Sequence, residues 1–106
     1  MERQSMTLNI RYDLPNGVWE NTIPKIYESM EGWVGFVKSD ENDSIPYWFN
    51  TDEQQKHIWA SVEPSGLLFE GRMTDAEWKE WKLKIKKIAT QKLGFKVGEI
   101  ELGEVD

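Results

Sequence analysis

The sequence predicts a single α+β domain, with a mostly antiparallel sheet of about five strands and one short and one long helix packed on it. Several short runs alternate apolar and polar residues, as strands do. Two other stretches place apolar residues three or four positions apart, as amphipathic helices do. Because 106 residues suit one ordinary domain, we expect one hydrophobic core over residues 1–106, with disorder allowed for at residues 1–5.

The first third of the chain predicts a strand and a short helix. Residues 6–12 alternate, so that every second side chain faces the same way. Residues 13–17 contain Pro and Gly, which are strong turn formers. Apolar residues then recur at helical spacing over 23–30, and Gly32 supplies the stop.

The middle of the chain predicts a meander of short strands. Residues 38–44 are polar and acidic without periodicity, which indicates a solvated loop. Glu63 to Gly66 has the Pro and Gly of a hairpin turn. The strands expected around these turns cover residues 33–37, 47–49, 57–62 and 67–70.

The long helix has the clearest signals. Thr74 and Glu77 have the spacing of a capping box, in which each side chain satisfies the other residue's backbone N–H. Apolar residues follow in a stripe at steps of three and four, and Gly94 ends the helix. We expect a helix over 75–93 and a final strand over 95–100.

Charge is distributed unevenly around that helix. Residues 76–96 hold seven lysines against two glutamates, a local charge of +5, whereas 1–75 carry −7 and 97–106 carry −4. A small nucleic-acid-binding or regulatory protein that uses the basic helix 75–93 is therefore an alternative function. It is not the leading one, because the lysines spread around the helix and the net charge of −6 repels phosphate. We therefore expect neither nucleic acid nor a membrane as partner.

Groups that perform chemistry are scarce. The chain has no cysteine and one histidine, His57, which we expect at the surface. Carboxylate pairs such as Asp52 and Glu53 could act as acid and base or hold a cation, but no catalytic, phosphate-binding or metal motif accompanies them. The expectation is a protein that is not an enzyme and has no cofactor and no metal.

A segment rich in aromatic and acidic residues, from 40 to 59, is the candidate contact surface. Strand alternation puts Tyr47 and Trp48 on opposite faces, so at least one large ring should approach the surface. An exposed ring among carboxylates suits a basic protein partner. The same rings could instead pack under the helices, with the acids serving solubility alone. The candidate residues are Asp40, Glu41, Asp43, Tyr47, Trp48, Asp52, Glu53 and Trp59.

Two features that are missing from the sequence, a membrane-length apolar run and a secretory signal, predict the compartment. The longest apolar runs, such as 33–37 and 66–69, fall far short of the roughly 20 residues that span a bilayer. The first residues carry charges of both signs and no secretory signal is visible. We expect a cytoplasmic protein that is a monomer or a weak dimer.

The C-terminal part resembles small bacterial immunity proteins that accompany polymorphic or contact-dependent toxins. The resemblance lies in Trp78-Lys79-Glu80-Trp81, Ile88-Ala89-Thr90 and the run 93–100, and covers roughly residues 74–101. It implies a cytoplasmic, non-enzymatic protein that binds a cognate toxin domain, often a nuclease, and covers its basic active site. No functional residue transfers, because the similar segment is mainly a core helix and strand.

Overall fold

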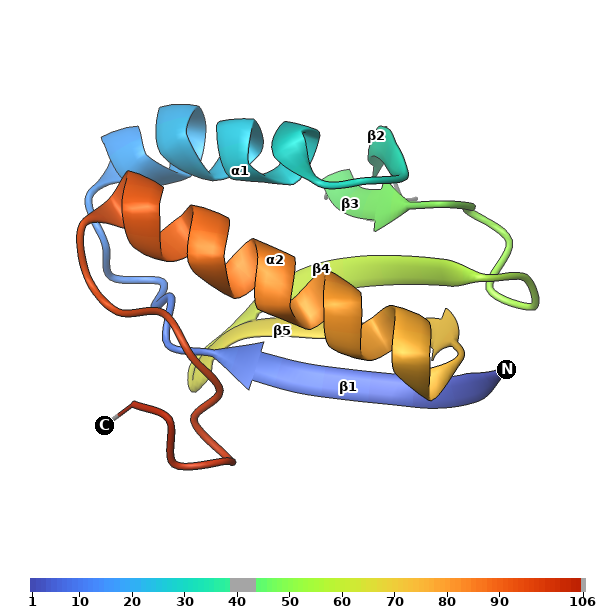
Figure 1. The fold of residues 1–106 in the computed structure, drawn as a ribbon. Coiled ribbons are helices and arrows are strands. Elements are labelled where there is room, and N and C mark those ends of the chain that lie inside the picture. Colours follow the sequence, from blue (N-terminus) through green and yellow to red (C-terminus); the bar gives the residue numbers. More distant parts are fainter. Residues whose placement is uncertain (39–43, 106) are drawn as a thin grey trace.

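The computed structural model describes residues 1–38 and 44–105 and shows the predicted α+β domain (Figure 1). Five strands form one antiparallel sheet in the order β1-β5-β4-β3-β2. The elements are β1 (Glu2–Leu8), the π-helical turn η1 (Val18–Thr22), α1 (Ile23–Ser29), β2 (Trp33–Lys38), β3 (Ser44–Trp48), β4 (His57–Glu63), β5 (Gly66–Met73) and α2 (Asp75–Leu93).

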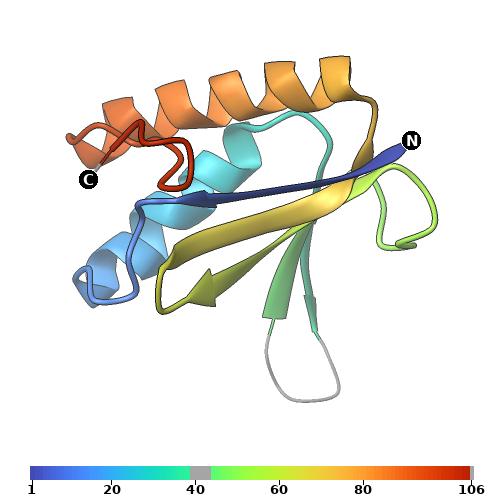
Figure 2. The same cartoon turned by 90° about the horizontal axis from the view of Figure 1, so that it is seen from below.

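The domain has two layers. Both helices lie on one face of the sheet, and no described helix covers the other face (Figure 2). α2 packs over the β1 side and α1 beside β2, and the two helices contact each other. The inward faces of β4 and β5 alternate with outward residues, which produces one core between the layers.

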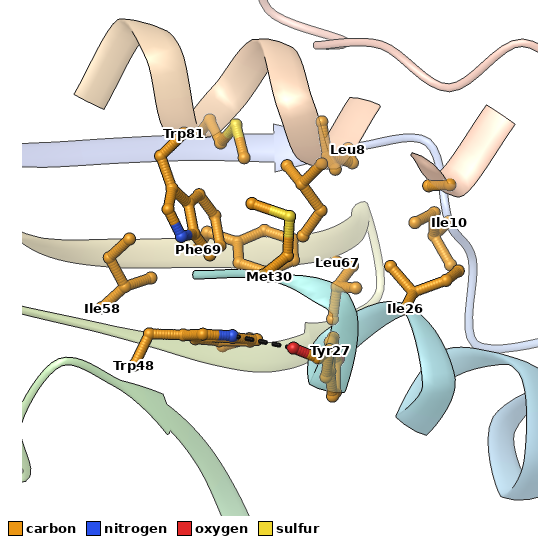
Figure 3. Close-up of a cluster of buried hydrophobic side chains, with 14 of the residues drawn as sticks. Leu8, Ile10, Ile26, Tyr27, Met30, Trp48, Ile58, Leu67, Phe69 and Trp81 are labelled. Atoms are coloured by element: carbon orange, nitrogen blue, oxygen red, sulfur yellow. Dashed lines mark hydrogen bonds between the residues drawn. The ribbon is translucent and has the colours of Figure 1, made fainter. Parts of the chain in front are cut away.

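Trp48 lies at the centre of that core (Figure 3). Its ring centroid is 5.1 Å from that of Tyr27 in α1 and 5.2 Å from that of Trp81 in α2. The indole N–H donates a hydrogen bond of 3.1 Å to the Tyr27 carbonyl oxygen, so the buried polar atom has a partner. One side chain of β3 therefore joins both helices to the sheet.

The ends of α2 are those that the sequence predicts. The Thr74 hydroxyl oxygen accepts a hydrogen bond of 3.2 Å from the Glu77 N–H, which is the N-terminal half of a capping box. Met73 and Trp78 are buried at the positions of a hydrophobic staple. Gly94 adopts a left-handed conformation with φ 81°, and its N–H donates to the Thr90 carbonyl.

The first strand starts four residues earlier than its alternation suggests and ends at Leu8. Its partner β5 is eight residues long, so pairing extends from Leu8–Leu67 back to Glu2–Met73. The Gln4 side-chain amide strengthens this end by donating to the Met73 carbonyl oxygen at 3.1 Å. The N-terminal residues from Glu2 onward therefore belong to the sheet.

The expected final strand over 95–100 is wrong. The segment makes one isolated bridge to β1, between Leu8 and Glu99, with a hydrogen bond of 3.1 Å from the Ile100 N–H to the Thr7 carbonyl. A turn that begins at Ile100 ends any further pairing.

Charged groups hold the C-terminal segment against α2 instead. Lys86 Nζ lies 2.6 Å from a Glu99 carboxylate oxygen and 2.9 Å from one of Glu104, and Lys82 Nζ lies 3.0 Å from Glu99. Burial opposes the charge on Lys86, yet the hydrogen bonds to Glu99 and Glu104 outweigh it and raise the Lys86 pKa. The Glu99 backbone N–H and then Lys86 lower the Glu104 pKa. We call these four residues the C-terminal ion cluster.

Acid should release the C-terminal segment. Because the folded-state pKa of Glu104 is lowered, its contribution is present above the unfolded value of 4.5 and is lost as pH falls through the lower folded value. The amide protection of Ile100 should therefore decrease below pH 4.5, while that of Phe69 persists, as measured by hydrogen exchange. The Glu104→Gln variant should lack this pH step; a step of equal size in that variant would contradict the assignment.

Removing the N-cap should weaken α2. Thr74→Ala deletes the acceptor for the Glu77 N–H, and such caps contribute about 1 kcal/mol. Urea unfolding should show that loss in the free energy of unfolding with an unchanged m-value. Thr51→Ala is the matched control, because Thr51 is exposed in a turn.

Candidate functional site

Two large aromatic residues of the predicted segment lie together on the face of the sheet without helices. Tyr47 of β3 is directly opposite Trp59 of β4 in the strand register. Both are partly exposed, whereas their neighbours Trp48 and Ile58 are buried. Glu70 of β5 lies opposite Trp59 on its other side. The sheet therefore presents a row in which two rings adjoin a carboxylate.

Trp48 is not part of this surface. Its exposure is 0%, and its ring lies among Tyr27, Phe69 and Trp81. The alternation of β3 that turns Tyr47 outward turns Trp48 toward the helices. Trp48 therefore belongs to the core. This agrees with the other interpretation of the segment, in which such rings pack under the helices.

The acidic residues that the structure describes lie in the turn between β3 and β4. Asp52 and Glu53 are both exposed. An Asp52 carboxylate oxygen accepts from the Gln54 N–H at 2.9 Å, which organises the turn. Burial, and then the charge of Glu53, raise the pKa of Tyr47. Glu53 thus acts electrostatically on the aromatic row, whereas the candidates Asp40, Glu41 and Asp43 lie outside the described residues.

The rest of the helix-free face carries both signs of charge. Arg3 and Arg72 are cross-strand partners on β1 and β5. With Glu53, Trp59 and Glu70 they line a shallow hollow of about 90 Å³. We call Tyr47, Trp59, Asp52, Glu53 and Glu70, together with this arginine pair, the sheet-face patch.

His57 is buried rather than at the surface. Its exposure is 3%, and its Nδ1 lies 2.8 Å from the Gln55 carbonyl oxygen. The sequence places it beside a charged lysine at a strand start, which is typical of exposed positions. Pairing of β4 with β5, opposite Arg72, encloses it instead.

A larger cleft separates β3 from β4. These strands pair only at Tyr47–Trp59 and Trp48–Ile58, and beyond Pro46 they diverge (Figure 2). The cleft has a volume of about 460 Å³, within the range of about 300–1,000 Å³ typical of ligand pockets. Its lining includes Trp19, Tyr27, Phe36, Ile45, Trp59 and Val62. We call it the β3–β4 cleft. The sequence signal that could have indicated it is Pro46, which directly precedes the expected strand 47–49 and cannot donate a ladder hydrogen bond.

Phe49 has an unusual backbone conformation at the end of β3. Its φ is 72°, which costs a non-glycine residue about 1–3 kcal/mol. The Phe49 N–H donates to the Gly32 carbonyl at 2.6 Å, and the ring lies where any side chain at Gly32 would be. Lys56 Nζ sits 4.3 Å from the ring centroid and pairs with Glu77 of α2. These contacts hold the strained residue and connect the Asp52 turn to α2.

The basic helix offers fewer free charges than its sequence suggests. Lys82 and Lys86 are occupied by the C-terminal ion cluster. Lys79, Lys84 and Lys87 are exposed. The charge of α2 is thus partly neutralised within the domain.

The described residues form neither a metal-ligand cluster nor a membrane-spanning helix. Within residues 1–38 and 44–105, no three His, Asp or Glu side chains converge as a metal site would require. None of the helices in these ranges has the length and apolar character to cross a bilayer.

Comparisons with known proteins identify no relative. The chain matches no protein family, no curated protein and no solved structure.

Neutralising Glu53 should change the ionisation of Tyr47. Glu53→Gln should lower the Tyr47 pKa, but not to the ordinary tyrosine value, because burial is the larger cause of the shift. Asp52→Asn is the matched control and should leave the titration unchanged. NMR titration of the Tyr47 ring protons measures both; an equal effect of the two variants would refute the specific role of Glu53.

Proposed function

We propose that this is a non-enzymatic binding protein of the immunity type, which neutralises a cognate bacterial toxin domain by docking the sheet-face patch on it. The observation that supports this most directly is the pairing of Tyr47 with Trp59 on a face that no described helix covers. Such rings are the residue types that dominate binding free energy at protein interfaces.

The patch is suited to form a stable contact. Tyr and Trp supply large contact areas with few rotatable bonds, so little side-chain entropy is lost on binding. They stand on neighbouring strands of one sheet, which fixes their spacing before the partner arrives. A partner can therefore bury both rings without rearranging the domain.

The charge of the protein favours a basic partner. The net charge is −6, and Asp52, Glu53 and Glu70 belong to the patch. Such charges accelerate encounter with a cationic surface and add specificity. The Arg3–Arg72 pair at the other end would meet a carboxylate of the partner, which fixes the orientation of docking.

A nuclease toxin fits these requirements best. Its active site must bind phosphate, so it presents the cationic surface that the carboxylates of the patch complement. Bound there, Asp52 and Glu53 would occupy the place of substrate phosphates and exclude nucleic acid. The resemblance of residues 74–101 to immunity proteins supports the same role independently of the patch.

The alternative function, nucleic-acid binding by α2, gains no support. Two lysines near the middle of the helix, Lys82 and Lys86, already pair with Glu99 and Glu104. Phosphate would have to compete with these carboxylates. Replacing Lys86 would moreover disturb the C-terminal segment, so loss of binding in such a variant would not identify a contact.

The test is co-purification with the toxin domain that a neighbouring gene encodes, followed by binding kinetics. Tyr47→Ser and Trp59→Ser should each weaken the complex by roughly 30-fold or more, since hot-spot truncations cost about 2–4 kcal/mol. Tyr12→Ser is the matched control, because Tyr12 is 63% exposed and lies away from the patch. The double variant Asp52→Lys with Glu53→Lys should slow association, less so at high salt.

Two results would contradict the proposal. One is a toxin domain that binds the Tyr47 and Trp59 variants as tightly as the unmodified protein. The other is the absence of any complex with the neighbouring gene product when both proteins are folded. Circular dichroism of each variant must show an intact fold for either result to count.

A further inference from the structure

The β3–β4 cleft is bordered by strand edges rather than by side chains alone. Beyond the Tyr47–Trp59 pair the register would place Pro46 opposite Ala60. Proline has no N–H, so it cannot donate to the Ala60 carbonyl and the ladder cannot continue normally. Among residues 1–38 and 44–105, the last residues of β4 therefore pair on one side only, with β5.

The direction of the β4 backbone groups follows from the hydrogen bonds of β1. The Thr7 carbonyl accepts from Ile100, so the backbone polar groups of Thr7 point away from β5. Thr7 lies opposite Leu68, which must then bond to β4 on its other side. The β4 residue opposite Leu68 is Ser61, whose polar groups thus face β5.

The alternation of backbone groups along β4 determines which way the N–H and C=O of Ala60 and Val62 point. Because Ser61 faces β5, its neighbours Ala60 and Val62 direct their N–H and C=O groups toward β3. No β3 residue pairs with Val62. Its N–H and C=O, with the Ala60 carbonyl, border the cleft as an open edge.

The interior of the cleft offers mainly apolar contacts. Phe36 and Val62 each expose nearly half of their surface beside Ile45 and Trp59. Trp19 also lines the cleft, and its buried indole N–H has no hydrogen-bond partner among the described residues. Because protein atoms enclose that N–H, the surface that the cleft offers to a ligand is mainly apolar.

We propose that the β3–β4 cleft binds an extended segment of a partner protein, which adds to the free edge of β4 as an antiparallel strand. Its backbone would bond to the N–H and C=O of Val62 and donate to the Ala60 carbonyl. Its inward side chains would be apolar, as the lining requires. This site goes beyond the sheet-face patch and does not depend on the function proposed above.

The charge at the end of the edge specifies the segment further. Glu63 follows Val62 as the last residue of β4, and its carboxylate accepts a hydrogen bond of 2.8 Å from the Ser61 hydroxyl. Together with the net charge of −6, this favours a segment with Lys or Arg near Glu63. The occupant is thus an extended, basic peptide with alternating apolar residues.

The experiment uses a phage-displayed library of short random peptides, selected on the whole protein. Enriched peptides should alternate apolar residues and carry a basic one. Val62→Pro removes an edge N–H, and Pro46→Ala restores a donor that lets β3 close on β4; each should weaken binding about tenfold or more. Leu83→Ser, an exposed position on α2, and Tyr47→Ser, in the sheet-face patch, should bind as the unmodified protein does.

Hydrogen exchange at the Val62 amide provides a second measurement. The Val62 amide should exchange readily in the free protein and become protected when the peptide binds. In Pro46→Ala it should be protected without peptide, because β3 then pairs with β4. A library that yields no enriched peptide overturns the proposal. Enriched peptides that bind both variants with unchanged affinity also overturn it. So do peptides that bind without protecting the Val62 amide, or whose binding is weakened only by Tyr47→Ser.

Discussion

The burial of Trp48 is the constraint on which the rest of the structure depends. Its ring fills the space between the sheet and both helices, and its N–H is satisfied by the Tyr27 carbonyl. Truncating a buried Trp typically costs about 3–5 kcal/mol, a large part of a small domain's stability. Because β3 must point Trp48 inward, it must point Tyr47 outward. The position of the sheet-face patch is thus a consequence of core packing.

Strand β3 is held in the core at its C-terminal end and is not paired with β4 at its N-terminal end. Trp48 holds the C-terminal end of β3 in the core, while Pro46, two residues earlier, ends pairing with β4. The strained conformation of Phe49 then redirects the chain into the Asp52 turn. A few residues therefore set the sheet-face patch, the β3–β4 cleft and the acidic turn at once. Changes at the exposed positions of this segment would alter these three features without removing the rest of the core.

The sequence predicts those features that depend on neighbouring residues. The Thr74 N-cap and the apolar stripe of α2, the Gly94 stop and the Glu63–Gly66 hairpin are local, and all are confirmed. Features decided by distant contacts are not predicted. The start of β1 depends on the length of its partner β5. Residues 95–100 form no strand, and Glu99 pairs with Lys82 and Lys86 of α2. The face of Trp48 depends on which side of the sheet the helices cover, and the burial of His57 depends on the pairing of β4 with β5.

The C-terminal ion cluster has an effect on the edge of the sheet. β1 is the outermost strand on its side, and the segment held by Lys86 covers its end near Leu8. An uncovered strand end is a template on which another chain can pair and begin aggregation. Proteolytic trimming before Glu99 would uncover that template and also leave a lysine buried without its counter-charge. The C-terminal segment therefore shields the Leu8 end of an edge strand from pairing with another chain.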